Sequence, residues 1–532
     1  MPAIRPSRSH RKPLAAAALG GLLLGLATPP FNAWALVLPA LGLLRLSFHW
    51  ATSGGLAAQA GFVWAMMGGL VGLRFVPSVV DRFSALGLSG GTVAWILLAA
   101  LQAVAWGGAA AIATVLERRW RVPGPVAFAI SVYVAVSLPA VFPWTPAALM
   151  SPWLASIQLA EFVGERGLSF LFALTTAWLV QPVLSGVRWW LHAGAGLLAL
   201  GGMTLYGRWR LVTPMTQAPI SMRIGLVQPM LQAHRHRSSR DKYFALRTLQ
   251  RLTRIAEDRG AELVIWPEAA YPYPLPHGAS QAPGGERQIL AAGIRGPLLF
   301  GAVTESAGSR YNSALTLARN GILSPPQPKL RPLWFGEAVP MADTFPSLAR
   351  LSPRAIRAGR DAVLQRAGAA RMGVLNCYED TLPDTARRIA MAGPNLLVNV
   401  TNDAWFEGTR ESELHLLLSV MRAVESRLDL VRAVNGGAAA WVDATGRIRA
   451  RGTAEGESAL LVTPALREHS PTWFVRFGNA PLLLAMLGLA AYLALRAVLQ
   501  NGTAKPIGPK VECPPPDDSP AQRPAANTSL RG

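Results

Sequence analysis

The chain up to about residue 211 consists of long apolar runs separated by short polar stretches. Several of these runs approach the roughly 20 residues that a helix needs to cross the hydrocarbon core of a membrane. One more run of this kind follows near the C-terminus. The pattern predicts an α-helical membrane bundle of about eight transmembrane helices. The runs lie at 14–27, 34–48, 54–73, 92–116, 125–141, 168–184, 189–206 and 480–499.

Between residues 218 and 468 the pattern changes to short apolar runs that alternate with amphipathic segments of ordinary polarity. Short apolar runs bounded by turn residues indicate strands, and apolar residues at helical spacing indicate helices. The alternation predicts a layered α/β domain. The predicted strands are 222–228, 262–266, 297–303, 312–317, 372–376, 395–401 and 430–434, and the predicted helices are 240–258, 382–392 and 412–426.

Basic residues at the ends of the apolar runs predict the orientation of the chain. If the helices alternate in direction, the groups at 5–12, Arg45, 118–121 and Arg188 all fall on one side. That side is expected to be cytoplasmic, because cytoplasmic loops carry an excess of Lys and Arg. The predicted parts are a cytoplasmic N-terminus (1–13), a transmembrane domain (14–211), an outward-facing α/β domain (218–468), a C-terminal transmembrane helix (480–499) and a disordered cytoplasmic tail (500–532).

The composition agrees with a membrane protein. Hydrophobic residues make up 51% of the chain and charged residues 15%, which is too apolar for an ordinary soluble protein. The net charge of +21 could indicate nucleic acid, but the basic residues are scattered or flank apolar runs. Anionic lipid head groups are therefore the expected partner, and no nucleic acid is expected. Residues 142–167 are interpreted as an outer loop whose Trp144 and Trp153 anchor the membrane interface, with a lining for the lipid entrance as the alternative.

Cys377 lies at the end of the apolar run 372–376, where polar and acidic residues take over. A strand end is a good position for a nucleophile, because the sheet holds the backbone while nearby N–H groups can face a substrate oxygen. From this segment alone a buried core cysteine is the alternative. The other cysteine, Cys513, lies in the Pro-rich tail, so a disulfide is not expected. The chain has no paired Cys and His spacing that would indicate a metal site.

Two charged residues occupy comparable settings. Glu268 ends the run Leu-Val-Ile-Trp-Pro-Glu, and Lys329 begins the segment Lys-Leu-Arg-Pro-Leu-Trp-Phe-Gly-Glu. With Cys377, they resemble the catalytic trio of the nitrilase superfamily. Together with the apolar runs, the chain resembles the apolipoprotein N-acyltransferases, the membrane-bound members of that superfamily.

Further motifs carry this resemblance over nearly the whole chain. Lys329 precedes Glu337 by eight residues, as the family pattern requires, and the nucleophile motif Cys-Tyr-Glu is present at 377–379. The other matching segments are Arg310-Tyr-Asn-Ser313, Asn402-Asp-Ala-Trp405-Phe406, His415, Met421-Arg-Ala423 and Arg432-Ala-Val-Asn435. The departures are Met230, Leu330, Arg331 and Glu407, which lie near the substrate rather than in the trio and bear on the preference for the acyl donor.

The resemblance implies a fold, a reaction and a location. The fold would be a nitrilase-like αββα sandwich beside the membrane bundle. The reaction would move an acyl chain from a phosphatidylethanolamine-like phospholipid to the N-terminal diacylglyceryl-cysteine of apolipoproteins, without a cofactor. The protein would be a monomer in the bacterial inner membrane, with its catalytic domain facing the periplasm. The implied roles are base for Glu268, oxyanion stabilisation for Lys329, nucleophile for Cys377 and support for Glu337, Tyr378 and Glu379.

Four residues are expected to contact the substrate. The segment 330–345 has a high apolar load and is punctuated by proline and glycine, so it is interpreted as a loop. Such a loop could place Trp334 and Phe335 at the membrane interface beside an acyl chain, although packing against the domain itself is an equal alternative. Asn402 and Trp405 are expected to shape a loop at the substrate, and His415 is given no role.

Two other function classes remain open from the sequence. A nitrilase-type amidase tethered to the membrane would hydrolyse a small amide, but a tether needs only one span. A membrane scaffold or transporter would have no use for Glu268, Lys329 and Cys377 together, and its spans would be expected to carry charges.

Overall fold

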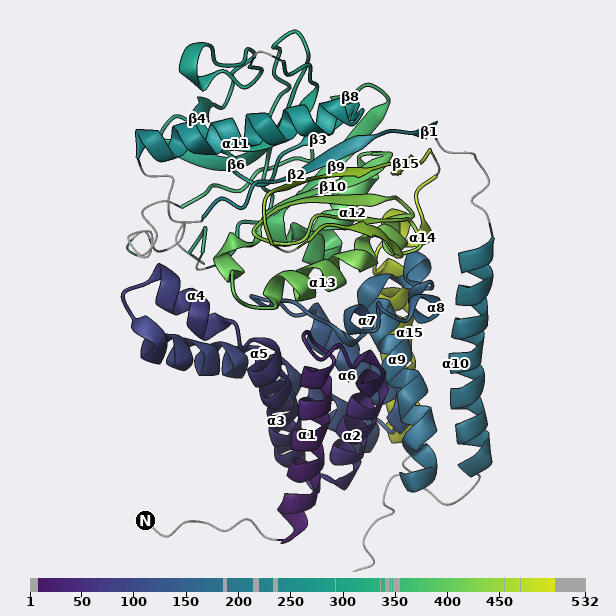
Figure 1. Cartoon of the computed structure of the whole chain (residues 1–532). Helices are drawn as coiled ribbons and strands as arrows, with labels where there is room; N and C mark the ends of the chain where they lie inside the picture. The colour runs from purple at the N-terminus through teal and green to yellow at the C-terminus, as the bar shows by residue number, and fades with distance from the viewer. Residues whose placement is uncertain are drawn as a thin grey trace, which may run out of the picture. The chain divides into compact units, whose positions relative to one another are not determined.

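Figure 1 shows a computed structural model of the 532-residue chain. It describes residues 8–502 except 185–188, 214–219, 233–237, 292, 335, 340–344, 346, 348–354, 454 and 469. The expectations for the first seven residues, Arg188, Phe335 and the tail with Cys513 lie outside the described residues. The chain divides into two compact units, Met1–Leu482 and Leu483–Gly532.

The predicted apolar runs all form helices. Three of these helices, α3, α5 and α9, are long and apolar enough to cross a membrane, and three shorter apolar helices cover Trp34–Trp50, Gly124–Ser137 and Ala480–Arg496. The total of eight spans stays a prediction. The helices are α1 (Arg8–Leu26), α2 (Val37–Trp50), α3 (Gly54–Gly72), α4 (Val76–Phe83), α5 (Gly87–Arg118), α6 (Gly124–Ser137), α9 (Ala160–Leu184), α10 (Trp189–Val212) and α15 (Ala480–Gly502).

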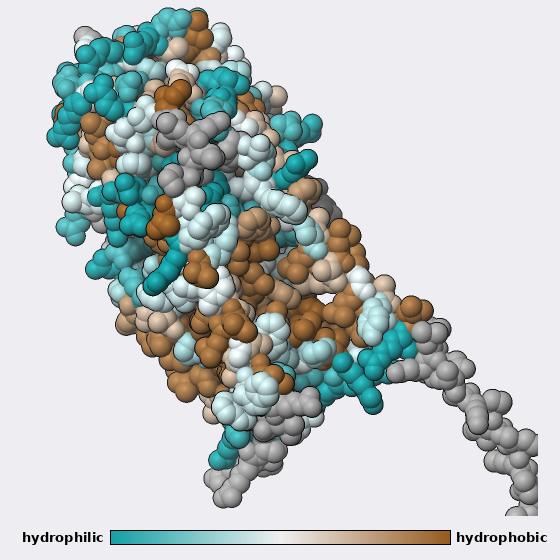
Figure 2. Space-filling view, turned by 90° about the vertical axis from the view of Figure 1, so that its right-hand side faces the viewer, coloured by the Kyte–Doolittle hydropathy of each residue, from teal (hydrophilic) through white to brown (hydrophobic). Residues whose placement is uncertain are grey.

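The surface of this helical region is apolar. Outward-facing leucines on α5 and α10 are well exposed, with Leu97 at 63% and Leu198 at 78%. Figure 2 shows hydrophobic residues gathered over the helical part of the molecule and hydrophilic residues gathered over the α/β domain. A surface of this extent is expected to contact lipid. Small residues allow the helices to pack closely, since a Cβ at Gly61 of α3 would lie 2.5 Å from the carbonyl oxygen of Trp106 on α5.

The segment 142–167 is not the loop that the sequence predicts. It contains the short helices α7 (Pro146–Leu149) and α8 (Leu154–Ile157) and the first part of α9, with a kink at Gly164, whose φ is 66°. Trp144 and Trp153 are half buried against the helical core. The prediction failed because polar residues such as Glu161 and Glu165 interrupt the apolar pattern, although both are buried in the fold.

These two glutamates join α9 to α13 (Glu411–Ser426) of the α/β domain. Glu161 pairs with Arg427 at 2.6 Å, and Glu165 pairs with Arg422. The backbone N–H of Glu165 also donates to Glu425 at 2.7 Å. All five side chains are buried, so breaking one pair would leave an uncompensated charge at a cost of about 3–5 kcal/mol. The α/β domain is therefore anchored on the helical region through polar as well as apolar contacts.

The α/β domain begins with a seven-stranded sheet in the order β14-β2-β3-β5-β6-β7, with β4 also paired to β5. Strands β2, β3 and β5 run parallel, and β6 returns antiparallel to β5. The bounds are β2 (Ile224–Gln228), β3 (Leu263–Ile265), β4 (Tyr271–Pro276), β5 (Leu298–Ser306), β6 (Ser309–Leu317), β7 (Gln327–Pro328) and β14 (Ser458–Val462).

A second sheet has the order β13-β12-β11-β10-β9-β8. Its central strands β9, β10 and β11 are parallel, so their carboxyl ends meet at one edge of the sheet. The bounds are β8 (Gln365–Ala367), β9 (Ala370–Asn376), β10 (Leu396–Asn402), β11 (Leu430–Asn435), β12 (Ala440–Val442) and β13 (Ile448–Arg451). Strands β1 (Ile220–Ser221) and β15 (Ala465–Leu466) form a separate two-stranded sheet, and Leu466 packs in the core between the larger sheets.

The two sheets pack face to face and helices cover their outer faces. Apolar residues of β2, β3, β9, β10 and β11 form the core between the sheets. Helix α11 (Ser239–Asp258) covers the outer face of the first sheet. Helices α12 (Pro383–Met391) and α13 cover the second sheet and share a core with the helical region. The layers α, β, β and α, visible in Figure 1, are the predicted nitrilase-like sandwich.

Candidate active site

Cys377 follows the last residue of β9 and opens the short turn η4 (Cys377–Thr381). Its φ of 56° lies in the left-handed region, which residues other than glycine rarely adopt outside strained functional sites. Asn399 of β10 donates from Nδ2 to the Cys377 carbonyl at 2.8 Å and holds this turn. Burial, and then the Glu268 carboxylate, raise the pKa of the thiol well above its usual range. The thiol therefore needs a base before it can act as a nucleophile.

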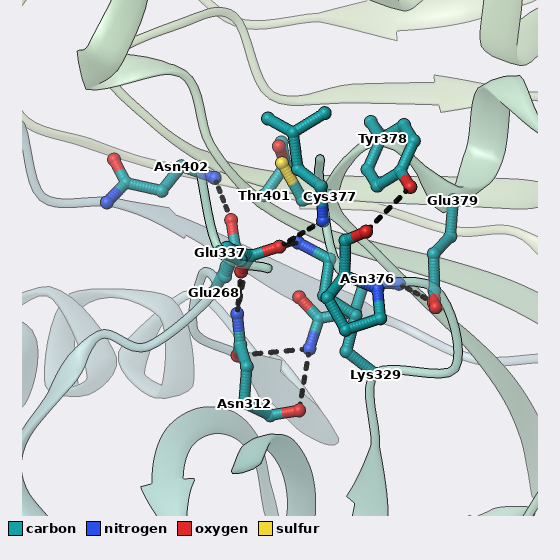
Figure 3. Close-up of polar contacts among 12 residues, drawn as sticks. Glu268, Asn312, Lys329, Glu337, Asn376, Cys377, Tyr378, Glu379, Thr401 and Asn402 are labelled. Atoms are coloured by element: carbon teal, nitrogen blue, oxygen red, sulfur yellow. Dashed lines mark hydrogen bonds and ion pairs between the residues drawn. The ribbon is translucent and has the colours of Figure 1, made fainter. Parts of the chain in front are cut away.

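Glu268 lies just beyond the end of β3 and is 6% exposed. One carboxylate oxygen accepts from Asn312 Nδ2 at 2.7 Å and lies 3.1 Å from Lys329 Nζ. The other accepts from the backbone N–H of Asn402 at 3.0 Å. Figure 3 shows these groups converging near Cys377 from separate elements. The carboxylate is thus held in one orientation, as a general base must be.

Lys329 follows β7 and is almost completely buried. Its Nζ lies 2.7 Å from Glu337 Oε2 and 3.1 Å from Glu268 Oε1. Burial by itself would lower the pKa of Lys329, but the two carboxylates raise it well above its usual range. The same attraction outweighs burial at Glu337 and lowers the pKa of that carboxyl. Lys329 therefore stays charged and can stabilise an oxyanion.

Glu379 orders the backbone around Cys377. Its carboxyl accepts from the backbone N–H groups of Leu330 at 2.6 Å, Arg331 at 2.8 Å and Asn376 at 2.8 Å. Burial raises its pKa to about 7, although these three N–H groups act in the opposite direction. The contacts join the segment after Lys329 to the end of β9. Glu379 thereby fixes Lys329 and Cys377 relative to one another.

Asn312 of β6 has a position in the site that the sequence analysis did not recognise. Its Nδ2 donates to Glu268 at 2.7 Å and to Glu337 at 3.1 Å, and its Oδ1 accepts from Asn376 Nδ2 at 3.1 Å. Asn312 therefore bridges the two carboxylates that contact Lys329. The sequence offered one sign of this position. Asn312 is a polar residue in a predicted strand, and it belongs to the segment Arg310-Tyr-Asn-Ser313 that matches the family pattern.

Two family models match the chain. The carbon-nitrogen hydrolase model covers residues 223–468, and the model of the N-terminal domain of apolipoprotein N-acyltransferase covers residues 20–178. The apolipoprotein N-acyltransferase of Geobacter metallireducens is 32% identical over 383 residues, covering 66% of this chain and 70% of the relative. The chain belongs to the apolipoprotein N-acyltransferase family. It is therefore an acyltransferase of the carbon-nitrogen hydrolase superfamily and a membrane protein.

Two further similarities cover different shares of the chain. The apolipoprotein N-acyltransferase of Bdellovibrio bacteriovorus is 27% identical over 518 residues, covering 91% of this chain and 93% of the relative. An amidase structure from Nesterenkonia is 19% identical with a TM-score of 0.36, covering 51% of this chain and all of that protein.

A cavity of about 1050 Å³ reaches Tyr378, the residue that follows Cys377. Tyr378, whose hydroxyl donates to the Pro332 carbonyl at 3.1 Å, lines it, and so does Trp334, which is 42% exposed. Asn402 reaches the site through its backbone contact with Glu268. Trp405 does not line this cavity and lies against Phe83 of α4, with the ring centroids 4.1 Å apart. The predicted substrate contacts of Asn402 and Trp405 stay predictions.

A second buried charged group lies behind the turn that carries Cys377. His415 on α13 contacts Asp380 with Nε2 at 2.7 Å and Asp403 with Nδ1 at 3.0 Å. Arg432 of β11 pairs with Asp380 and lies 3.8 Å from Asp403. We call these four residues the His415 cluster, and we call Cys377, Glu268, Lys329 and Glu337 the nucleophile cluster.

The His415 cluster is an ion-pair network. Burial would lower the pKa of His415, but Asp380 and Asp403 raise it to about 10, so the imidazole is charged and donates from both nitrogens. Asp403, His415 and the neighbouring Glu411 could in principle hold a metal ion. Because both ring nitrogens of His415 already face carboxylates and Arg432 adds a second cation, we assign the group to ion pairing.

Proposed function

We propose that this protein moves an acyl chain from a phospholipid, through a thioester on Cys377, to the α-amine of the N-terminal diacylglyceryl-cysteine of apolipoproteins. The observation that carries the proposal is the Glu268–Lys329 pair beside the Cys377 turn, in a chain of this family. Similar relatives are named apolipoprotein N-acyltransferase, which supports these substrates.

In the first half of the reaction, Glu268 takes the thiol proton while Cys377 Sγ attacks the carbonyl carbon of a phospholipid ester. The carbonyl electron pair moves to oxygen, and the resulting oxyanion is stabilised by Lys329 Nζ and the backbone N–H of Tyr378. Each such donor contributes about 3–4 kcal/mol. The ester C–O bond then breaks, and the departing alkoxide takes the proton from Glu268. A lysophospholipid leaves and the acyl chain remains on Sγ.

In the second half, the free amine of the lipoprotein attacks the thioester carbonyl. Glu268 accepts a proton from the amine, and the same donors stabilise the second oxyanion. The C–S bond breaks, an amide forms, and the Glu268 proton returns to the thiolate of Cys377. One carboxyl group therefore serves both halves, and these steps use only side chains and backbone donors.

Glu337 and Glu379 are proposed to hold Lys329 and Cys377 in position rather than to react with the substrate. Glu337 keeps Lys329 charged and Glu379 holds the two catalytic segments together, as their contacts indicate. We place residues 14–211 and 480–499 in the bacterial inner membrane and residues 218–468 on its periplasmic side, because the basic residues cluster at the opposite ends of the helices.

The proposal can be tested with purified full-length protein in mixed micelles that contain a phospholipid labelled in its acyl chain. We expect label on the protein that hydroxylamine releases, as it cleaves thioesters, and no label on Cys377→Ala. Addition of a diacylglyceryl peptide with a free N-terminal amine should move the label to that peptide. Label on Cys377→Ala, or release of free fatty acid alone with no transfer to the peptide, would contradict the proposal.

A further inference from the structure

The two carboxylate oxygens of Glu268 are held differently. Oε1 accepts from Asn312 Nδ2 at 2.7 Å and from Lys329 Nζ at 3.1 Å. Among the described residues, Oε2 accepts one hydrogen bond, from the backbone N–H of Asn402 at 3.0 Å. Because a carboxylate oxygen has two lone pairs, both pairs of Oε1 are engaged and one pair of Oε2 is left. Oε2 is therefore the oxygen that can receive the thiol proton of Cys377, and the Asn402 N–H sets its position.

The side chain of Asn402 holds this backbone donor in place. Asn402 is the last residue of β10, where the chain leaves the sheet and enters the short turn η5 (Asp403–Phe406). Its Oδ1 accepts from the Ala404 N–H at 3.3 Å and from Asn435 Nδ2 at 2.9 Å. Figure 3 shows the backbone nitrogen of Asn402 facing Glu268 while its side chain points away. The position of the donor therefore depends on contacts behind it.

Asn435 connects Asn402 to a third segment of the chain. It is the last residue of β11, lies opposite Asn402 in the register of β10 and β11, and is 4% exposed. Its Nδ2 also donates to the Leu231 carbonyl at 2.8 Å, and its Oδ1 accepts from the Leu231 N–H at 2.7 Å. Leu231 follows β2 of the first sheet, after a turn in which Met230 has a φ of 53°. Both amide hydrogens and the oxygen of Asn435 are thus engaged, and the side chain joins the two sheets.

We propose that Asn435 is a positioning residue that sets the proton-accepting oxygen, Oε2 of Glu268, through Asn402. This inference rests on the proposed function, in which Glu268 accepts a proton in both halves of the reaction. The path consists of two hydrogen bonds, at 2.9 and 3.0 Å, with one residue between them. Without the Asn435 amide, the end of β10 loses its tie to the segment after β2. A displacement of a reacting group by about 1 Å can lower a rate by about 10²-fold.

The test is a double-mutant cycle between Asn435→Ala and Glu268→Gln in the full-length protein. The measured quantity is the initial rate of Cys377 labelling at increasing concentrations of acyl-labelled phospholipid in mixed micelles. We expect Asn435→Ala to lower the maximal rate by about 10–100-fold and to leave the half-saturating concentration within about twofold. In the Glu268→Gln background, the same change should lower the residual rate by less than about threefold, because residues that act as one unit are not additive.

Asn395→Ala is the matched control. Asn395 is 2% exposed, immediately precedes β10 and lies at the opposite end of that strand from Asn402. Its Oδ1 accepts from one backbone N–H, and its Nδ2 donates to one backbone carbonyl and one side chain, as in Asn435; the partners are Arg371, Ala369 and Glu468. The control removes an equally buried amide that has no link to Glu268. Its maximal rate should stay within about twofold of that of the unchanged protein.

Asn402→Ala tests the same path from its other end and replaces Asn435→Ala if that variant does not fold. It removes the acceptor of Asn435 but keeps the backbone N–H that faces Glu268, and we expect the same loss in maximal rate. Equal losses with and without Glu268, a raised half-saturating concentration at an unchanged maximal rate, no loss in either variant, or the same loss in the control would each overturn the inference and leave the proposed function intact. Absence of label on the unchanged protein would instead contradict the proposed function.

Discussion

The two buried charged clusters on either side of the Cys377 turn differ in charge balance. The His415 cluster holds two carboxylates, Asp380 and Asp403, against two cations, His415 and Arg432. The nucleophile cluster holds two carboxylates, Glu268 and Glu337, against one cation, Lys329. The His415 cluster is neutral, because each carboxylate is balanced by a cation, and we call it closed. Such a cluster can stabilise the fold. The nucleophile cluster has a surplus carboxylate, which is what a proton acceptor for a buried thiol requires.

The contacts of the two clusters agree with this division. The His415 cluster joins η4, which carries Cys377, to η5 (Asp403–Phe406) and α13. Glu268 instead combines hydrogen bonds from Asn312 and the Asn402 backbone with a contact to Lys329 Nζ at 3.1 Å, so it shares its cation with Glu337. Because Asn402 directly precedes Asp403, the His415 cluster also supports the position of Glu268.

Removing the surplus carboxylate should have the largest effect. Glu268→Gln leaves Lys329 paired with Glu337 but removes the proton acceptor, so thioester formation should fall by about 10²–10⁴-fold. Loss of the Glu268 charge should also lower the raised pKa of Cys377. The residual rate should therefore rise between pH 7 and 9. The measurement is the rate of Cys377 labelling against pH.

Glu262→Gln is the matched control for this variant. Glu262 immediately precedes β3 and its side chain is half exposed, whereas Glu268 follows the same strand. The control should retain the activity of the unchanged protein. Normal labelling by Glu268→Gln at pH 7 would show that another group takes the thiol proton.

Changing the shape of the single cation should have the next largest effect. Lys329→Arg keeps the charge, but Lys329 is fully buried between two carboxylates at 2.7 and 3.1 Å, where a larger planar group does not fit. We expect a loss of about 10²–10³-fold in the rate of labelling, similar to the loss of one oxyanion donor. Activity within a few-fold of the unchanged protein would mean that Lys329 supplies only a diffuse positive charge.

The sequence predicts the elements of the nucleophile cluster better than those of the His415 cluster. Apolar runs that end at Cys377 and just before Glu268 are visible without coordinates, because strands carry a strong local pattern. Strand β4, Tyr-Pro-Tyr-Pro-Leu-Pro, was missed because its prolines suppress that pattern, and among the described strands it pairs with β5 alone.

Pairings that depend on packing could not be predicted. His415 lies 35 positions from Asp380, and the two meet only because α13 packs on the second sheet. For this reason the sequence analysis gave His415 no role. Asn312 shows the same limit, because its contacts with Glu268 and Glu337 join three separate segments.

Removing one cation from the His415 cluster should lower the stability of the protein more than its rate of acyl transfer. His415→Gln leaves Asp380 and Asp403 with Arg432 alone, which should cost about 3–5 kcal/mol because a buried charge loses its partner. We expect faster thermal inactivation in detergent, and a fall of about tenfold or less in transfer at a permissive temperature. His277→Gln is the control, because His277 is half buried and its side chain makes a hydrogen bond to Thr304 but contacts no carboxylate among the described residues.

The pH dependence separates this role from simple packing. The folded-state pKa of His415 is about 10 and its ordinary value is 6.5, so its charge contributes full stability below pH 6.5 and loses that contribution as the pH rises through about 10. The difference in inactivation temperature between the unchanged protein and His415→Gln should therefore shrink from pH 6.5 to 10. Glu411 nearby has a pKa that burial raises to about 8, so both proteins should be compared in a Glu411→Gln background. A difference that stays constant across this range would show that His415 fills space rather than carrying the charge that balances Asp380 and Asp403.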